Sequence, residues 1–244
     1  MLLLSNNRND VANAMHPRPV LQIDFAFHTL SKTVARAGWV ILRGPASYKI
    51  LESTLLEICN ELGRPGVGRN GNAVETLTPM HQRQANCRSL SAKFGFGAFP
   101  LHTDGAHLPR PPRFVLLACV DAGLTPVPTT LVHLRDVDLT SDTRAALETA
   151  IFVVRNGRHC FYSSILCASR QFLRFDRECM RPSEPASSIA ARAFSDAILR
   201  VEPQFINWHP GDIVVIDNWN VLHGRGIDDV HPSANRTLLR ATVE

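Results

Sequence analysis

The chain has 244 residues, of which 45% are hydrophobic and 20% charged, and its net charge is +4 at pH 7. These values predict one large folded domain or two small ones, with a sizeable core, and exclude a chain that is disordered overall. No apolar run approaches the roughly 18 residues of a membrane helix, and the apolar start at residues 1–4 is too short for a secretory signal.

The basic residues and the cysteines are both scattered along the chain. Only three of the 26 basic residues are lysines, and no basic block indicates binding to nucleic acid. The excess of arginine over lysine indicates first a composition bias, and the alternative is that some arginines hold a small acidic ligand, because a guanidinium matches a carboxylate. The six cysteines include no C-x-x-C pair, which excludes a zinc ribbon. We therefore expect free thiols and a cytoplasmic protein.

The first part of the chain predicts an arm followed by helices around one strand. Residues 1–20 are polar and are expected to form a loose arm ahead of a single domain over residues 21–244. We expect strands at residues 21–27 and 39–42, and helices at residues 29–37 and 47–62 that end at Gly38 and Gly63, with Ser47 as an N-cap. Residues 63–80 are predicted to form a loop. Their G-x-G-x-x-G is not expected to bind a dinucleotide, since no strand enters it.

Beyond residue 89 the pattern changes to short apolar strands separated by glycine and proline. We expect strands at residues 114–120, 129–132, 151–154, 205–208, 213–216 and 237–243, and helices at residues 140–150 and 187–199. Residues 209–212 predict a tight turn. Early helices and many later strands favour a β-sandwich or an open barrel with helices around it.

Two stretches carry residue types that bind metal ions. His102 and Asp104 form the only H-x-D in the chain and would share one face of a strand. His223 is followed by Gly224, which lets other groups approach closely. Each stretch alone is also typical of an ordinary surface or core site. Together, two imidazoles and one carboxylate make up the facial triad of non-haem Fe(II).

The last predicted strand places Arg236, Leu238 and Arg240 on one face. Two arginines that point inward require anions, because burying unpaired charge is costly. On a strand face that is open to solvent, the same two arginines would not indicate a bound anion.

Three segments, LHTDGAHLPRPPRF, GDIVVIDNWNVLHGRG and NRTLLRATV, resemble in this order the taurine-dioxygenase-like and clavaminate-synthase-like Fe(II)/2-oxoglutarate-dependent dioxygenases. The resemblance covers roughly residues 20–244. It implies a mainly β fold, a double-stranded β-helix or cupin-like jelly roll, with helices on the outside. It also implies that His102, Asp104 and His223 are the catalytic iron ligands, and that the cofactors are Fe(II), 2-oxoglutarate as cosubstrate, and O2.

The resemblance further implies how the two acids are held. Arg236 matches the arginine that pairs with the distal carboxylate of 2-oxoglutarate, and Thr129 matches a hydroxyl that assists it. The Gly-Gly that usually precedes this threonine is replaced by residues 127–128, Val-Pro, so Thr130 stays an alternative. Arg240 matches a second arginine that faces the primary substrate in several relatives. This suggests an anionic substrate, such as an amino acid or a related small acid.

Lys93, Phe94 and Phe96 precede the H-x-D and are candidate substrate residues at the mouth of the site. Gly95 and Gly97 would let this segment move, although the end of a core strand is equally compatible with the pattern.

The expected reaction is oxidation, usually hydroxylation, of an unactivated C–H bond of a small polar metabolite, with release of succinate and CO2. Desaturation or ring closure at the same site stays open. The alternatives are a cupin-like metal hydrolase or isomerase, which needs no Arg236, and a non-catalytic sensor of small acids. The expected partner is a small-molecule substrate, with no nucleic acid and no membrane, and a homo-oligomer stays open.

Overall fold

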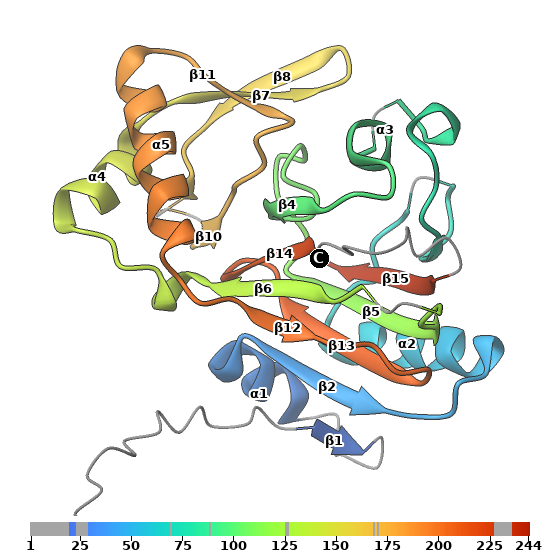
Figure 1. Cartoon of the computed structure of the whole chain (residues 1–244). Helices are drawn as coiled ribbons and strands as arrows, with labels where there is room; N and C mark the ends of the chain where they lie inside the picture. Colours follow the sequence, from blue (N-terminus) through green and yellow to red (C-terminus); the bar gives the residue numbers. More distant parts are fainter. Residues whose placement is uncertain are drawn as a thin grey trace, which may run out of the picture.

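The computed structural model describes residues 20–22, 29–68, 70–87, 89–124, 127–167, 169, 171–226 and 236–244. Its core is a pair of facing β-sheets (Figure 1). The larger sheet contains, in order across it, β1 (Val20–Gln22), β2 (Trp39–Arg43), β13 (Asp212–Asp217), β5 (Phe114–Asp121), β15 (Thr237–Val243) and β3 (Val74–Leu77). The smaller sheet contains β12 (Gln204–Ile206), β6 (Thr129–His133), β14 (Val221–Arg225) and β4 (Phe99–His102).

Apolar side chains from both sheets meet in the space between them. Leu117 of β5 and Val214 of β13 pack there with Leu131 of β6 and Val221 of β14. The neighbouring Leu116 of β5 points to the opposite face and packs under helices. Because both faces of β5 are buried, its sequence is a continuous apolar run rather than an alternating one.

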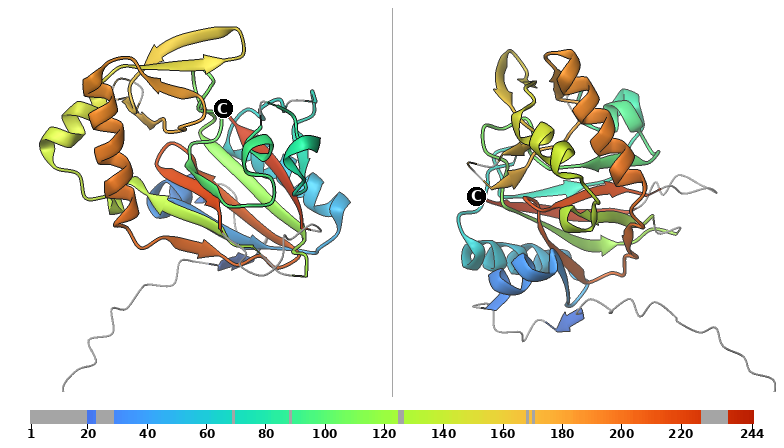
Figure 2. Two further views of the ribbon diagram at one scale, coloured as in Figure 1. Left: turned by 45° about the horizontal axis from the view of Figure 1, so that its top comes forward. Right: turned by 90° about the vertical axis from the view of Figure 1, so that its left-hand side faces the viewer.

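Two helices, α1 (Leu30–Ala37) and α2 (Tyr48–Leu62), cover the outer face of the larger sheet (Figure 2). α2 buries Leu51, Leu55 and Ile58, whose spacing places them on one side of the helix. Both helices end at the glycines predicted from the sequence. Ser47 occupies the predicted N-cap position of α2, but its side chain makes no capping hydrogen bond.

The chain between β6 and β12 forms an outer layer beside the smaller sheet. It contains α4 (Ser141–Thr149), β7 (Phe152–Asn156), β8 (His159–Ser163), β9 (Leu166–Cys167), β10 (Phe172–Leu173), β11 (Met180–Pro182) and α5 (Pro185–Leu199). Its apolar core includes Leu147 and Phe194, and it packs on Val132 of β6 and Leu222 of β14. Thr140 caps α4, because its hydroxyl accepts a hydrogen bond from the Thr143 N–H at 3.1 Å.

Most predicted elements are confirmed within a few residues at their ends, but β3 and β14 were missed. β3 lies in the stretch predicted to be a loop, and it pairs with β15. β14 has a polar sequence around His223, yet it is buried between β6 and β4. The strand assumed around His102 and Asp104 is present as β4, but it ends at His102, so Asp104 lies in the following turn and the two residues do not share a strand face. The short helix α3 (Ser91–Phe94) and the 3-10 turns η2 (Gln82–Gln84) and η3 (Leu134–Asp136) were not predicted. β3 and β14 form because segments far apart in the sequence pair with them, and not because of an alternating apolar pattern.

Other expectations have mixed outcomes. The predicted arm lies almost wholly outside the described residues, as does most of the strand predicted at residues 21–27. All six cysteines, each within the described part, are free thiols, with Cys59 and Cys119 buried and Cys87 and Cys160 exposed. Among the described helices, none has the length and apolarity that crossing a membrane requires.

Candidate metal and cosubstrate site

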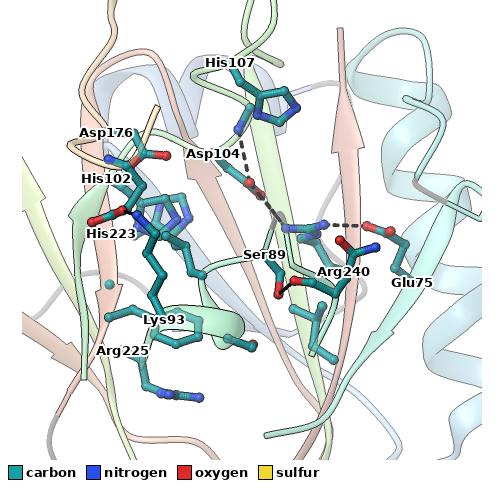
Figure 3. A pocket seen from close by; sticks show the side chains of 18 of the residues that line it. Glu75, Ser89, Lys93, His102, Asp104, His107, Asp176, His223, Arg225 and Arg240 are labelled. Atoms are coloured by element: carbon teal, nitrogen blue, oxygen red, sulfur yellow. Dashed lines mark hydrogen bonds and ion pairs between the residues drawn. The ribbon is translucent and has the colours of Figure 1, made fainter. Parts of the chain in front are cut away.

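A cavity of about 850 Å³ lies between the two sheets, and most of the predicted site residues line it (Figure 3). The predicted residues on its wall are His102, Asp104, His223, Arg236, Thr129, Arg240 and Lys93. Three other candidates, Phe94, Phe96 and Thr130, are not on this wall. Phe94 packs instead on Phe99, with ring centroids 5.9 Å apart. The fold therefore brings the two metal-binding stretches and the two arginines into one space.

The two histidines are cross-strand partners. His102 at the end of β4 pairs with His223 of β14, and their ring centroids are 4.7 Å apart. The Nδ1 of His102 lies 2.9 Å from the carbonyl oxygen of Pro100. Since a carbonyl only accepts, Nδ1 carries the hydrogen and Nε2 keeps a free lone pair.

His223 is only 7% exposed, and its buried Nδ1 has no hydrogen-bond partner among the described residues. Burial, reinforced by the neighbouring His102, lowers the pKa of His223 to about 3. The imidazole is therefore neutral at pH 7 and can donate a lone pair. The imidazoles of His223 and His102 line one cavity, and two imidazoles are a donor set suited to a divalent transition metal.

Asp104 follows β4 in a turn, and its carboxylate is directed at Arg240 rather than at the imidazoles (Figure 3). Its two oxygens lie 3.1 and 3.3 Å from Nη1 of Arg240. As the side chains lie, no three His, Cys, Asp or Glu residues in the described part of the chain are placed to hold a metal ion. A metal bound by His102, Asp104 and His223 requires the carboxylate to turn towards the imidazoles. The donor types fit Fe(II), and the ligand assignment stays a prediction.

Arg236 lies directly before β15 and is 8% exposed. Its Nη1 donates to the carbonyl oxygen of Val127 at 2.7 Å, while its buried Nε has no partner among the described residues. Burial lowers the pKa of Arg236. A buried guanidinium with an unused donor is best satisfied by an anion in the cavity.

Thr129, at the start of β6, lies on the same cavity wall and is 5% exposed. Its hydroxyl oxygen accepts a hydrogen bond from the indole N–H of Trp208 at 3.0 Å. This leaves the hydroxyl hydrogen of Thr129 available for an acceptor in the cavity. Thr130 is the next residue on the strand and points to the other face. Of the two alternatives left open by the sequence, Thr129 is therefore the one on the cavity wall.

Arg240 is shared between two carboxylates. Besides Asp104, it contacts Glu75 of β3, with 2.5 Å between Nη2 and Oε2 (Figure 3). The charge of Asp104, together with the contacts to Glu75, raises the pKa of Arg240. Glu75 was missed in the sequence because it stands in a stretch predicted to be a loop. The only available signal was the requirement that an inward arginine has an anionic partner.

Arg225 is a further residue that sequence reasoning missed. It lines the cavity two residues after His223 and is 7% exposed. Its guanidinium donates to the carbonyl oxygens of Gly95 and Gly97 and lies 3.8 Å from the ring centroid of Phe99. Burial, followed by the charge of Arg236, lowers the pKa of Arg225 to about 10. Arg225 thus attaches the segment after α3 to β14.

Polar residues of the outer layer complete the wall. Asp176 stands beside His102 (Figure 3), and burial raises the pKa of its carboxyl group. Glu178 forms an ion pair with Lys93, the candidate mouth residue, across the cavity. Arg155 of β7 also lines this side. The cavity therefore offers charges of both signs.

Substituting Gly224 by alanine tests how closely β14 and β4 must approach. A Cβ at Gly224 would lie 2.5 Å from the carbonyl oxygen of Phe99 and 3.2 Å from the carbonyl carbon of Pro100. We expect the strands to be forced apart beside the histidine pair. The free energy of unfolding should fall by about 1–3 kcal/mol, and Mn(II) affinity should fall with it. Urea denaturation and metal titration measure both effects.

The matched control is Gly97→Ala, where the added Cβ meets a single backbone atom, the oxygen of Phe94, at 3.1 Å. It should lose less stability and keep its affinity for Mn(II). Equal stability and equal metal affinity in Gly224→Ala and the wild type would contradict the close approach.

Comparison with known proteins finds a matching family model. Residues 140–242 match the model of the Taurine catabolism dioxygenase TauD, TfdA family, a range that includes His223, Arg236 and Arg240 but neither His102 nor Asp104. The resemblance seen in the sequence motifs is thereby confirmed for this part of the chain.

Several solved structures share the fold. One is asparagine oxygenase in complex with Fe(II), 2S,3S-3-hydroxyasparagine and succinate, with TM-score 0.72 and 20% identity over 89% of this chain and 77% of that chain. Another is the non-heme iron oxygenase OrfP in complex with Fe and alpha-ketoglutaric acid, with TM-score 0.65 and 20% identity over 89% and 78%. A third is PvcB from Pseudomonas aeruginosa, an Fe, alpha-ketoglutarate-dependent oxygenase, with TM-score 0.67 and 20% identity over 93% and 83%. The predicted mainly β, cupin-like fold is confirmed.

Proposed function

We propose that this chain is a non-haem Fe(II)- and 2-oxoglutarate-dependent oxygenase. It oxidises, usually by hydroxylation, a C–H bond of a small polar metabolite and releases succinate and CO2. One observation carries the proposal: two imidazoles on paired strands share a cavity with the buried guanidinium of Arg236, which forms no ion pair with the described residues. A metal-binding end and an anion-binding end in one cavity suit a dicarboxylic cosubstrate that binds a metal at its other end.

The chain's own part in this reaction is to bind and to orient. His102, His223 and Asp104 would hold the iron, and the hydrogen bond from His102 to Pro100 fixes which ring nitrogen faces the cavity. When bound, iron and 2-oxoglutarate supply the oxidative chemistry, in which O2 oxidises the substrate and 2-oxoglutarate loses CO2. The protein places the substrate C–H bond and excludes competing reactions.

The distal carboxylate of 2-oxoglutarate would be held by Arg236 and Thr129. Arg236 offers Nε, which has no partner among the described residues, and Thr129 offers a hydroxyl hydrogen because Trp208 already occupies its oxygen. Charge-assisted hydrogen bonds to a carboxylate are among the stronger polar contacts in proteins. This corner can therefore distinguish a dicarboxylic 2-oxo acid from a monocarboxylic one.

The substrate we propose is an amino acid or a related small acid. Charges of both signs on the cavity wall support this choice, with Asp176 as an acid and Arg155 as a cation, joined by Arg240 when the Asp104 carboxylate turns towards the imidazoles. Two neighbours in fold agree with it, since asparagine oxygenase and OrfP were solved with hydroxyasparagine and (3S)-hydroxy-L-Arg. Cytoplasmic location, the absence of a nucleic-acid partner and the oligomeric state stay predictions from the sequence.

The experiment that tests the function is a screen for succinate release. The protein is incubated with Fe(II), 2-oxoglutarate and air, together with amino acids, amino-acid derivatives and sulfonates. We expect one substrate class to stimulate succinate formation in equal amount to its own oxidation. Mass spectrometry then separates hydroxylation, which adds one oxygen atom, from desaturation or ring closure, which removes two hydrogen atoms.

The same screen distinguishes the alternatives. Omission of Fe(II) or of O2 should abolish succinate release. Turnover of a substrate with Zn(II) or Mn(II) and without 2-oxoglutarate would instead favour a metal hydrolase or isomerase. Binding of 2-oxoglutarate without turnover across the whole panel would favour a sensor of small acids.

A further inference from the structure

Asn218 is a fully buried residue in the turn between β13 and β14, and its side chain brackets the backbone of Asp104. Its Oδ1 accepts the Asp104 N–H at 2.9 Å, and its Nδ2 donates to the Asp104 carbonyl oxygen at 3.0 Å. Nδ2 also donates to the carbonyl oxygen of Pro112 at 2.8 Å. Asn218 is 0% exposed, so none of these bonds competes with bulk water.

These bonds hold Asp104 in the way that strand pairing holds a strand residue. β4 ends at His102, and Asp104 lies in the turn that follows it. A side-chain amide has the same donor and acceptor as a peptide group, and Asn218 pairs with both backbone groups of Asp104 as a neighbouring strand would. A flipped amide would place donor against donor and acceptor against acceptor, so the orientation of Asn218 is determined by its partners.

The same turn is also fixed by its own backbone and leads into the strand that bears another predicted ligand. The Asn218 N–H donates to the carbonyl oxygen of Arg113, which directly precedes β5, at 2.8 Å. β14, which begins directly after this turn, carries His223 opposite His102. The backbone of Asp104 is thus linked, through one side chain, to the start of the strand that holds His223.

We infer that Asn218 is a positioning residue, which acts through the Asp104 backbone to set where this carboxylate stands relative to the two imidazoles. The inference rests on the proposed function, because it assigns Asn218 to the same metal site. Hydrogen-bond partners of metal ligands affect metal affinity about 10- to 100-fold when they are removed. Such partners usually bond the side chain of the metal ligand, whereas Asn218 bonds the backbone N–H and carbonyl oxygen of Asp104.

The test is the substitution Asn218→Ala, read by metal binding without turnover. Mn(II) affinity is measured by anaerobic titration, and the visible spectrum of the Co(II)-loaded protein reports the ligand geometry. We expect the dissociation constant for Mn(II) to rise about 10- to 100-fold and the Co(II) spectrum to change. Asn218→Ser, which offers one hydroxyl in place of a separate donor and acceptor, should have the same effect to a smaller extent.

Trp219→Phe is the matched control. Trp219 is the next residue of the same turn, is 9% exposed, and donates from Nε1 to the carbonyl oxygen of Pro111 at 3.0 Å. The substitution therefore removes a buried hydrogen bond between the same turn and the same loop, but one that does not involve Asp104. We expect a lower melting temperature with the Mn(II) dissociation constant within about twofold of the wild type.

Each outcome decides the inference. Asn218→Ala with wild-type affinity and an unchanged Co(II) spectrum overturns it, and so does an equal loss of affinity in Trp219→Phe, which would indicate general loosening of the loop. If neither Asn218 variant folds while Trp219→Phe does, Asn218 is a folding residue and the inference is wrong. A wild type without metal affinity would overturn the proposed function as well, so the two failures are distinguishable.

Discussion

Replacing His223 by alanine is expected to abolish the metal-dependent binding of 2-oxoglutarate. Anaerobic addition of Fe(II) and 2-oxoglutarate to the wild type should produce a weak visible charge-transfer band, and His223→Ala should not show it. The reason is that a neutral, buried imidazole is removed from a pair whose rings are 4.7 Å apart. Partners of metal ligands affect activity 10- to 100-fold, so loss of a ligand should lower succinate release by at least about 100-fold.

His133→Ala is the control for this experiment. His133 is also 7% exposed, lies on the neighbouring strand β6 opposite Val221 of β14, and is not on the cavity wall. Its removal should lower stability by a similar amount and leave the band intact. An undiminished band in His223→Ala would contradict the assignment of the ligand, and an equal loss in both variants would attribute the effect to packing.

Arg236→Gln is expected to raise the KM for 2-oxoglutarate strongly. Truncating one partner of a buried charge pair typically costs about 2–5 kcal/mol, which corresponds to an increase of at least about 30-fold. The KM of Arg236→Lys should lie between the KM of the wild type and that of Arg236→Gln, because lysine keeps the charge but not the planar fork that a carboxylate matches. Rates of succinate formation at varied 2-oxoglutarate give the KM, and anaerobic titration gives the dissociation constant.

The control for Arg236 uses a different cosubstrate. The acid 2-oxopentanoate is a 2-oxo acid that lacks the distal carboxylate, so it has nothing for Arg236 to hold. Its binding to the wild type should be weak, and Arg236→Gln should change it by less than about threefold. A similar increase for both acids would show that Arg236 supports the cavity as a whole, and its proposed contact with the distal carboxylate would then be wrong.

Elements with a strong local pattern were predictable from the sequence. The apolar positions of α2 recur on one side of a helix, and β5 is a continuous apolar run. β3, β4 and β14 are short and mix apolar residues with polar ones, proline or glycine, and they form because distant strands supply their hydrogen-bond partners. Since a single sequence contains no information on which distant segments pair, β3 and β14 were not predicted and the end of β4 at His102 was not located.

Some residues of the candidate site could be identified from the sequence, and others could not. His102, Asp104 and Arg236 were identifiable because their motifs occur together and resemble a known family, although each stretch alone is typical of an ordinary surface or core site. Glu75 and Asn218 were not, since each acquires its role from a partner more than a hundred residues away in the chain. Their side chains are common ones, and only the contact makes them part of the site.

The amino-acid sequence by itself determined the chemical types at the site, namely two imidazoles, one carboxylate and arginines suited to an acid, and the order in which they occur. Only the tertiary structure decided that His102 and His223 are cross-strand partners, that Thr129 rather than Thr130 lines the cavity, and that Glu75 shares Arg240 with Asp104. The physical reason is that residue type is a local property. Strand register and the pairing of buried charges depend instead on contacts between segments that are far apart in the chain.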